Sequence, residues 1–247
     1  MAEAMNFARH VGARLDVLHA ASKTPEKEEA FAETFAALNG ETPEVIWLDG
    51  EGHPADTLLE AAASRGYDLL VAGALEREAH EEEKAFTGSV ARRFLMEAPS
   101  DVLLIPRPNE KCEPPTGLFF AAEPGQDIAE FLRKSVKALA LESMTFAVAE
   151  SPFAAAIASS KGEQPPNAHR WAEDVCKSIK NPSLEVDIRV IDSNTGFAVC
   201  DAAQCSGADL MLVRAQRLNG RIVFPSHLNW LQQVIPMRLL ISVAEEE

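Results

Sequence analysis

The stretch GYDLLVAG at residues 66–73 decides the fold, because a close copy of it, GADLMLVR, recurs at residues 207–214. Two other pairs of segments repeat at a similar spacing. They are EAPSDVLLI (97–105) with VIPMRLLIS (234–242), and LDVLHA (15–20) with TFAVAE (145–150). The spacing drifts from pair to pair, as it does when loops differ in length. The chain is therefore expected to consist of two related halves.

Outward from these segments, short apolar runs alternate with longer amphipathic stretches along both halves. Apolar runs suit parallel strands that are covered on both faces, and a 3.6-residue spacing of apolar positions suits helices. Strands are predicted at 15–20, 44–48, 68–73, 101–106, 117–123, 144–150, 185–191, 208–214 and 238–243. Helices are predicted at 26–38, 55–64, 89–97, 127–141 (with Asp127 as N-cap), 168–179, 197–205 and 228–234. The predicted fold class is α/β, with two tandem Rossmann-like open parallel sheets flanked by helices.

A proline-rich segment separates the two halves. Four prolines lie within residues 106–115. Proline favours extended backbone and lacks the N–H group that a strand ladder needs, so this segment is typical of a linker. We predict a first domain at 1–107, a linker at 108–116 and a second domain at 117–247.

The composition excludes several classes of function. The formal net charge is −15 and no basic stripe opposes it, so neither nucleic acid nor an anionic membrane surface is an expected partner. No apolar run is long enough to span a membrane, and the first residues lack the apolar core of a signal peptide. Four cysteines are too few for a disulfide scaffold of this size, so the expected compartment is a reducing cytoplasm.

The sequence offers neither a catalytic set nor a metal site. It contains no nucleophile elbow, no phosphate-binding P-loop and no H-E-x-x-H pair, so we assign no catalytic residue and expect no enzymatic activity. Cys200 and Cys205 lie five residues apart on a predicted helix and diverge around its axis, which does not suit a metal ion. His19 ends a predicted strand and is interpreted as an edge residue rather than a base.

GEGHPADTLLEAAASRGYDLLVAG (50–73), an acidic loop and TGSVARRFLMEAPSDVLLIPRP (87–108) follow one another in an order that resembles the universal stress protein family. The matching motifs are Gly52-His53-Pro54, the strand 67–73, Gly88-Ser89 and the segment 98–105. In the second half the resemblance is weaker and rests on 208–214 and 235–243. The resemblance implies two tandem domains of strand order 3-2-1-4-5 that pair within the chain. It also implies a role in the stress response through binding rather than turnover.

In that strand order the first strand is central, yet the first half has only four predicted strands. The counterpart of 118–123 would precede Met1. Three explanations stay open: the chain starts late, another segment (a swapped one, for example) fills the slot, or the first half is rebuilt around a narrower sheet. Buried unpaired amides are costly, so a folded chain needs the second or the third.

The resemblance implies a phosphate cradle in the first half, formed by Gly73, Gly88, Ser89 and Val90 at the start of a helix. The first half departs from the family pattern at Glu76, which replaces a second glycine. The loop EREAHEEEK (76–84) carries five glutamates against one arginine and one lysine. Each glutamate charge would repel a phosphate ~4 Å away by roughly 1 kcal/mol even in bulk water. ATP or AMP is therefore kept only as an alternative ligand.

In the second half, Arg214 stands where the first half has Gly73, and Ser226 and His227 stand where it has Gly88 and Ser89. The candidate anion-binding residues of this half are Arg214, Arg217 and Ser226, and Glu123 corresponds to the acid that the family carries after its first strand. We expect the arginines to pack against the acidic loop of the first half, at Glu78 to Glu83.

Two functions stay open at this point. The favoured one is a universal stress protein that acts by interaction and whose nucleotide sites are degenerate. The alternative is an adenine-nucleotide-binding regulatory module that uses Gly73, Gly88 and Ser89. The two halves are expected to pair with each other, and a homodimer stays open.

Overall fold

The computed structural model describes residues 1–38, 42–74, 87–106, 115–150, 156, 160–161, 167–233, 235 and 237–244. In the first half, the described elements follow the repeated segments closely. They are α1 (Ala2–Val11), β1 (Asp16–His19), α2 (Pro25–Ala37), β2 (Glu44–Trp47), α3 (Pro54–Arg65), β3 (Leu69–Gly73), α4 (Ser89–Glu97) and β4 (Asp101–Ile105). The helix α1 was not predicted.

The second half begins its strands at Thr116. Its elements are β5 (Thr116–Ala121), α5 (Ala129–Ala138), β6 (Ser143–Ala149), α7 (Ala168–Ile179), β7 (Glu185–Ile191), α8 (Gly196–Ser206), β8 (Leu210–Leu218), β9 (Arg221–Val223), η1 (Ser226–Gln232) and β10 (Arg238–Ala244). Some details differ from the prediction, among them that β8 continues to Leu218 and α5 ends at Ala138. Ile128 rather than Asp127 precedes α5, the segment predicted as a helix at 228–234 is a short 3-10 helix, and β9 was not predicted.

Local sequence signals explain where several helices begin and end. Thr24 accepts a hydrogen bond at Oγ1 from the Lys27 N–H at 3.4 Å, and a proline follows it at the first helical position of α2. Gly66 ends α3 in the left-handed region, at φ 65°, where a side chain would be strained. These caps satisfy backbone groups that a helix leaves unpaired at its ends.

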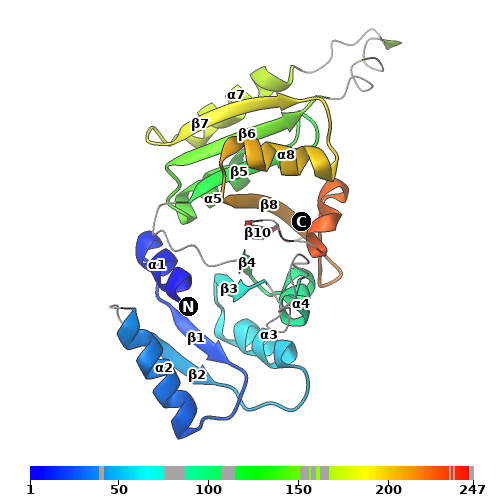
Figure 1. Cartoon of the computed structure of the whole chain (residues 1–247). Helices are drawn as coiled ribbons and strands as arrows, with labels where there is room; N and C mark the ends of the chain where they lie inside the picture. The colour runs from blue at the N-terminus through cyan, green and yellow to red at the C-terminus, as the bar shows by residue number, and fades with distance from the viewer. Residues whose placement is uncertain are drawn as a thin grey trace.

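The strands form two sheets, as Figure 1 shows. The larger one has eight strands in the order β3-β4-β10-β8-β5-β6-β7, with β9 paired to β8. The smaller one contains β1 and β2 alone. The α/β fold with parallel-rich sheets is therefore as predicted. The prediction of two separate tandem sheets is wrong, because β3 and β4 of the first half belong to one continuous sheet with the strands of the second half.

The last strand of each half makes this junction. β10 pairs in parallel with β8 and antiparallel with β4, where Leu240 lies opposite Leu103. Every other pairing in the two sheets is parallel except that of β8 with β9. A single strand of the second half thus connects the sheet portions of both halves through main-chain hydrogen bonds.

Helices cover both faces of the large sheet, and the alternation of β10 shows this directly. Leu239 and Ile241 belong to the buried cluster that includes residues of α4 and α8, whereas Leu240 belongs to the cluster that includes residues of α5 and α7. Successive strand residues point to opposite faces, so the two clusters lie on opposite sides of the sheet. All three leucine and isoleucine side chains are at most 4% exposed.

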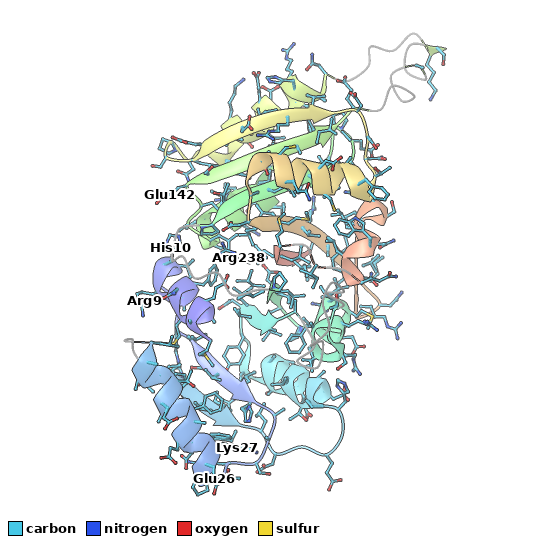
Figure 2. All side chains as sticks on the ribbon, in the orientation of Figure 1. Arg9, His10, Glu26, Lys27, Glu142 and Arg238 are labelled. Carbon is cyan, nitrogen blue, oxygen red and sulfur yellow. The ribbon has the colours of Figure 1, made fainter. Side chains whose placement is uncertain are left out.

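The N-terminal helix α1 packs onto the second half. The His10 ring nitrogen Nε2 lies 3.3 Å from the backbone oxygen of Ala140, which follows α5. In Figure 2, α1 with its labelled residues Arg9 and His10 faces the second half beside Glu142. Phe7 of the same helix contacts the buried cluster formed with α5 and α7. The first half is therefore held to the second by a helix as well as by the sheet.

The first half leaves two strand edges open. In the described part of the chain, β1 pairs only with β2, and β3 pairs only with β4. No described segment of the chain pairs with both of these edges, and the first-half strands are divided between the two-stranded sheet and the larger one.

The connection between the halves falls mostly outside the described residues. β4 ends at Ile105 and β5 begins at Thr116, and of the predicted linker at 108–116 only the last two residues are described. Among the described helices, none has the length and apolar character that a membrane crossing requires.

Candidate functional site

The second half contains a pocket of about 440 Å³ at the carboxyl-end side of β5 and β8. The chain leaves β5 toward β6 on one side and leaves β8 toward β10 on the other. Open α/β sheets bind ligands at such a point, where the direction of strand order reverses. The lining residues are Phe119, Phe120, Gln126, Asp127, Ile128, Leu212, Val213, Arg214, Gln216, Val223, Phe224, Pro225, His227 and Leu228.

Arg214 is the cation of this pocket. It lies in β8 and lines the pocket, and the comparison of the two halves had proposed it as an anion-binding residue. Its Nη1 donates to the backbone oxygen of Asp127, in the loop after β5. The guanidinium is thus engaged across the pocket mouth, although Arg has further N–H groups that a ligand can use.

His227 is the second polar group of the pocket, and burial lowers its pKa below the ordinary value, so the imidazole is neutral at pH 7. Its ring packs against Phe120 with centroids 5.8 Å apart. In the described structure its buried Nε2 has no hydrogen-bond partner. A buried nitrogen of this kind loses the hydrogen bonds it makes in water, so a ligand that supplied one would be favoured.

The other second-half candidates lie outside the pocket lining. Ser226 begins η1 beside the pocket and is exposed. Arg217 donates from Nη2 to the backbone oxygen of Ala98 at 2.8 Å, so it contacts the end of α4 in the first half. The contact predicted for it with Glu78 to Glu83 lies outside the described residues. Glu123 is exposed and does not line the pocket.

The first-half cradle residues gather around the start of α4. Gly88 precedes the helix, and its N–H donates to the backbone oxygen of Ala74, the residue after Gly73, at 2.9 Å. Ser89 is exposed and Val90 half-buried on the first turn. The cradle therefore has one of its N–H groups already bonded within the protein. Glu76 and the rest of the acidic loop lie outside the described residues.

The cradle is tied to the second half. The N–H of Thr87, directly before Gly88, donates to the backbone oxygen of Gln233 at 3.2 Å, just after η1. Thr87 is 3% exposed, and within the described residues its Oγ1 has no partner. The start of α4 and the end of η1 thus lie side by side, although the two helices belong to different halves.

No group of three or more metal-ligating side chains occurs among the described residues. Burial raises the pKa of the Cys176 thiol to about 11, with a smaller contribution from Glu173. Burial also raises the pKa of Cys200. Both thiols are thus less nucleophilic than a free cysteine, since the thiolate is the reactive form.

Sequence reasoning named Arg214, which lines the pocket, but missed three aromatic lining residues, Phe119, Phe120 and Phe224. It read the first two as part of a buried strand, which is also true, because both belong to β5. His227 was identified only as the residue in place of Ser89. The alignment of Ser226 and His227 with Gly88 and Ser89 was the feature of the sequence that pointed to this position.

Comparison with known proteins gives a family for the first half. Residues 1–106 match the model of the Universal stress protein family. No curated protein sequence matches the chain.

Solved structures match over both halves. The chain is similar to a functionally unknown protein from Pseudomonas aeruginosa PAO1, with a TM-score of 0.60 and 14% identity over 97% of this chain and 85% of that chain. A universal stress protein from Archaeoglobus fulgidus DSM 4304 gives a TM-score of 0.60 and 13% identity, over 98% of this chain and 92% of that chain. A further Pseudomonas aeruginosa structure gives 0.58 and 14%, over 97% and 86%. These likenesses show a shared tandem fold. The family match thus covers residues 1–106, and the likeness of the whole chain to the solved structures is one of fold.

Proposed function

We propose that this chain acts in the stress response by binding and interaction rather than by catalysis, with degenerate nucleotide sites. The observation that carries the proposal is the engagement of Arg214 at the pocket of the second half. A glycine lets the backbone approach a phosphate, whereas here an arginine side chain stands in its place and bonds the backbone oxygen of Asp127.

The element that follows the pocket supports the same reading. A phosphate is commonly held by several N–H groups at the start of an α-helix. In the second half that position is taken by η1, a 3-10 helix of seven residues. Short 3-10 helices have poorer hydrogen-bond geometry and a smaller aligned dipole than α-helices.

The first half supports it independently. The N–H of Gly88 bonds Ala74 rather than standing open to a ligand. The loop between β3 and α4 has the acidic composition EREAHEEEK, which opposes an anion.

A second candidate is the binding of a small aromatic anion, such as an adenine nucleotide, in the pocket of the second half. It is favoured by the combination of Arg214, the unpartnered Nε2 of His227 and the ring of Phe120 around about 440 Å³. This volume lies in the usual range for a small-molecule site.

Thermal denaturation with ATP and AMP, each with and without Mg²⁺, distinguishes the two candidates. The interaction proposal expects no change in Tm with any of these ligands. A nucleotide at 100 times its Kd would add about 2.7 kcal/mol of stability, or about 5–10 °C in Tm for a protein of this size.

Two variants assign any shift to a site. Arg214→Ala removes the cation of the pocket, and Arg221→Ala removes an exposed arginine of β9 that does not line it. A nucleotide-induced rise in Tm that disappears in Arg214→Ala and persists in Arg221→Ala would replace the interaction proposal by the nucleotide-binding one.

A further inference from the structure

In the first half no described strand lies between β1 and β3, a position that we call the slot, whereas the second half has β5 at the corresponding position. There, β5 pairs in parallel with β6 on one side and with β8 on the other. The repeated segments make β1 the counterpart of β6, and β3 the counterpart of β8. Among the described residues, β1 and β3 each have one pairing partner and keep the other edge open.

The strands on either side of this position are more buried in the second half, where β5 is present, than in the first. Six of the seven residues of β6 are buried, and so are the first four residues of β8. All four residues of β1 are half-exposed, and β3 has one buried residue. The half-exposed side chains include Val17, Leu18, Leu69 and Val71. Covering such apolar surface is favourable, at about 25 cal/mol for each Å² removed from water.

Asp209 shows how the second half holds the start of its central strand. Its Oδ1 accepts a hydrogen bond from the Thr116 N–H at 2.9 Å, and its own N–H donates to the Thr116 backbone oxygen at 3.1 Å. Asp68 has the same place in the repeat, because it follows Gly66 as Asp209 follows Gly207. In the described part of the chain, the exposed carboxylate of Asp68 has no hydrogen bond. An acceptor for the first N–H of an incoming strand is thus present.

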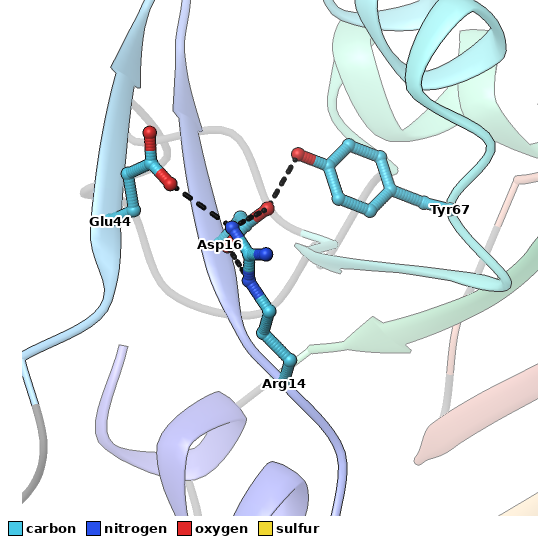
Figure 3. A network of polar contacts seen from close by, with 4 residues as sticks. All are labelled: Arg14, Asp16, Glu44 and Tyr67. Carbon is cyan, nitrogen blue, oxygen red and sulfur yellow. Dashed lines mark hydrogen bonds and ion pairs between the residues drawn. The ribbon is translucent and has the colours of Figure 1, made fainter.

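A hydrogen-bond network joins the two sides of the slot at the amino end of β1, as Figure 3 shows. The Tyr67 O–H donates to Asp16 Oδ2 at 3.0 Å, and Arg14 binds both Asp16 and Glu44 at 3.0 Å. Burial and the bond to Asp16 raise the pKa of Tyr67, so the hydroxyl keeps its proton. The network connects β1 with the residues before β3 although the two strands do not pair.

We propose that this slot binds an extended apolar segment of about six residues from a partner chain, as a parallel strand between β1 and β3. The six residues of β5, TGLFFA, give the chemistry of the occupant: uncharged, with aromatic and aliphatic side chains toward both faces. Main-chain hydrogen bonds to two open edges supply affinity, and Asp68 fixes the register by accepting the first N–H.

The test adds the synthetic peptide TGLFFAAE, residues 116–123 of this sequence, to the full chain. Titration calorimetry measures binding, and amide hydrogen exchange locates it. The expected result is a slowing of exchange by at least about tenfold in β1 and β3. A control peptide with Leu118→Pro and Phe120→Pro lacks two of the N–H donors and should not bind.

Two variants of the full chain test the register. Asp68→Ala should weaken peptide binding about tenfold, since it removes a charged hydrogen-bond acceptor. Glu60→Ala removes an exposed carboxylate of α3 and should leave binding unchanged. Both positions are exposed, so both variants should keep the Tm of the parent protein. The proposal is overturned by absence of protection in β1 and β3, by protection confined to the outer edges at β2 or β7, or by equal binding of the proline peptide.

Discussion

Glu3 in α1 and Arg238 in β10 form an ion pair between the two halves, with Oε1 3.4 Å from Nε and the side chains only 12% and 13% exposed. The same guanidinium donates from Nη2 to Asp209. Removing one partner of a shielded ion pair leaves an uncompensated charge and costs more than removing one partner of a surface pair, whose median contribution is about 0–1 kcal/mol. This contact therefore contributes to holding α1 on the second half.

Glu3→Gln should lower the free energy of unfolding by about 2 kcal/mol, because it removes one of the two carboxylates that serve a shielded guanidinium. Glu44→Gln is the matched control, since its ion pair with Arg14 is largely exposed. Urea denaturation of the two variants at pH 7 checks the difference. Equal losses of unfolding free energy in the two variants would show that the ion pair with Arg238 contributes no more to stability than an exposed one.

Leu104→Ala should destabilise the protein by about 2–5 kcal/mol, because this β4 side chain is fully buried in a cluster shared by both halves. Leu18→Ala in β1 should cost clearly less, since that side chain is half-exposed beside the open edge. Calorimetric or chemical denaturation measures both. A larger loss for Leu18 than for Leu104 would contradict the burial that distinguishes the two strands.

The stability of the wild-type protein should fall as the pH drops below about 6.5, in part because of His227. Burial lowers the pKa of this histidine in the folded state, so the unfolded chain takes up its proton more readily. Its contribution is complete above the unfolded pKa and is lost as pH falls toward the folded value. His227→Gln should weaken this dependence. Denaturation at pH 7.5 and pH 5.5 tests the slope, and the other histidines cancel because both proteins contain them.

Cys176 should resist thiol reagents in the folded protein. Its pKa of about 11 lies well above the ordinary value near 9, which leaves roughly a hundredfold less thiolate at pH 8. Cys205 is exposed and should react before Cys176. Timed alkylation followed by peptide mass spectrometry reads out each site. If Cys176 were labelled before Cys205, the burial of the Cys176 side chain in α7 would be contradicted.

The sequence predicted most elements because their boundaries are marked by local chemistry. The structure places α4 at Ser89–Glu97, α7 at Ala168–Ile179 and β7 at Glu185–Ile191, with the same bounds as predicted. Gly88 and Pro99 frame the first of these. Such signals act within a few residues and do not depend on the rest of the fold.

The elements that were missed depend on tertiary contacts. β9 has three residues and exists because it pairs with the end of β8. Its signal was present, since Asn219 and Gly220 both have positive φ, of 51° and 76°, as a two-residue hairpin turn requires. α1 buries only Met5 and Ala8 and packs mainly across the two halves. No local pattern predicts such a partner.

The candidate site also contains features that could be predicted from the sequence and features that could not. Arg214 could be predicted because the repeat aligns it with Gly73. The pocket itself could not, because it needs β5, β8 and η1 to meet. The absence of a central strand in the first half was recognised from the sequence, but the separation of β1–β2 from β3–β4 was not predicted and required the observed pairings.

The position of β10 has a consequence for biosynthesis. It is the last described strand to leave the ribosome, yet it lies between β4 and β8 in the middle of the sheet. The nascent first half must therefore expose the edge of β4 throughout translation of the intervening residues 106–237. Domains synthesised early usually fold early, and exposed edges invite aggregation. The edge of β4 is therefore covered only after β10 has been made, and slow translation of the second half would prolong its exposure.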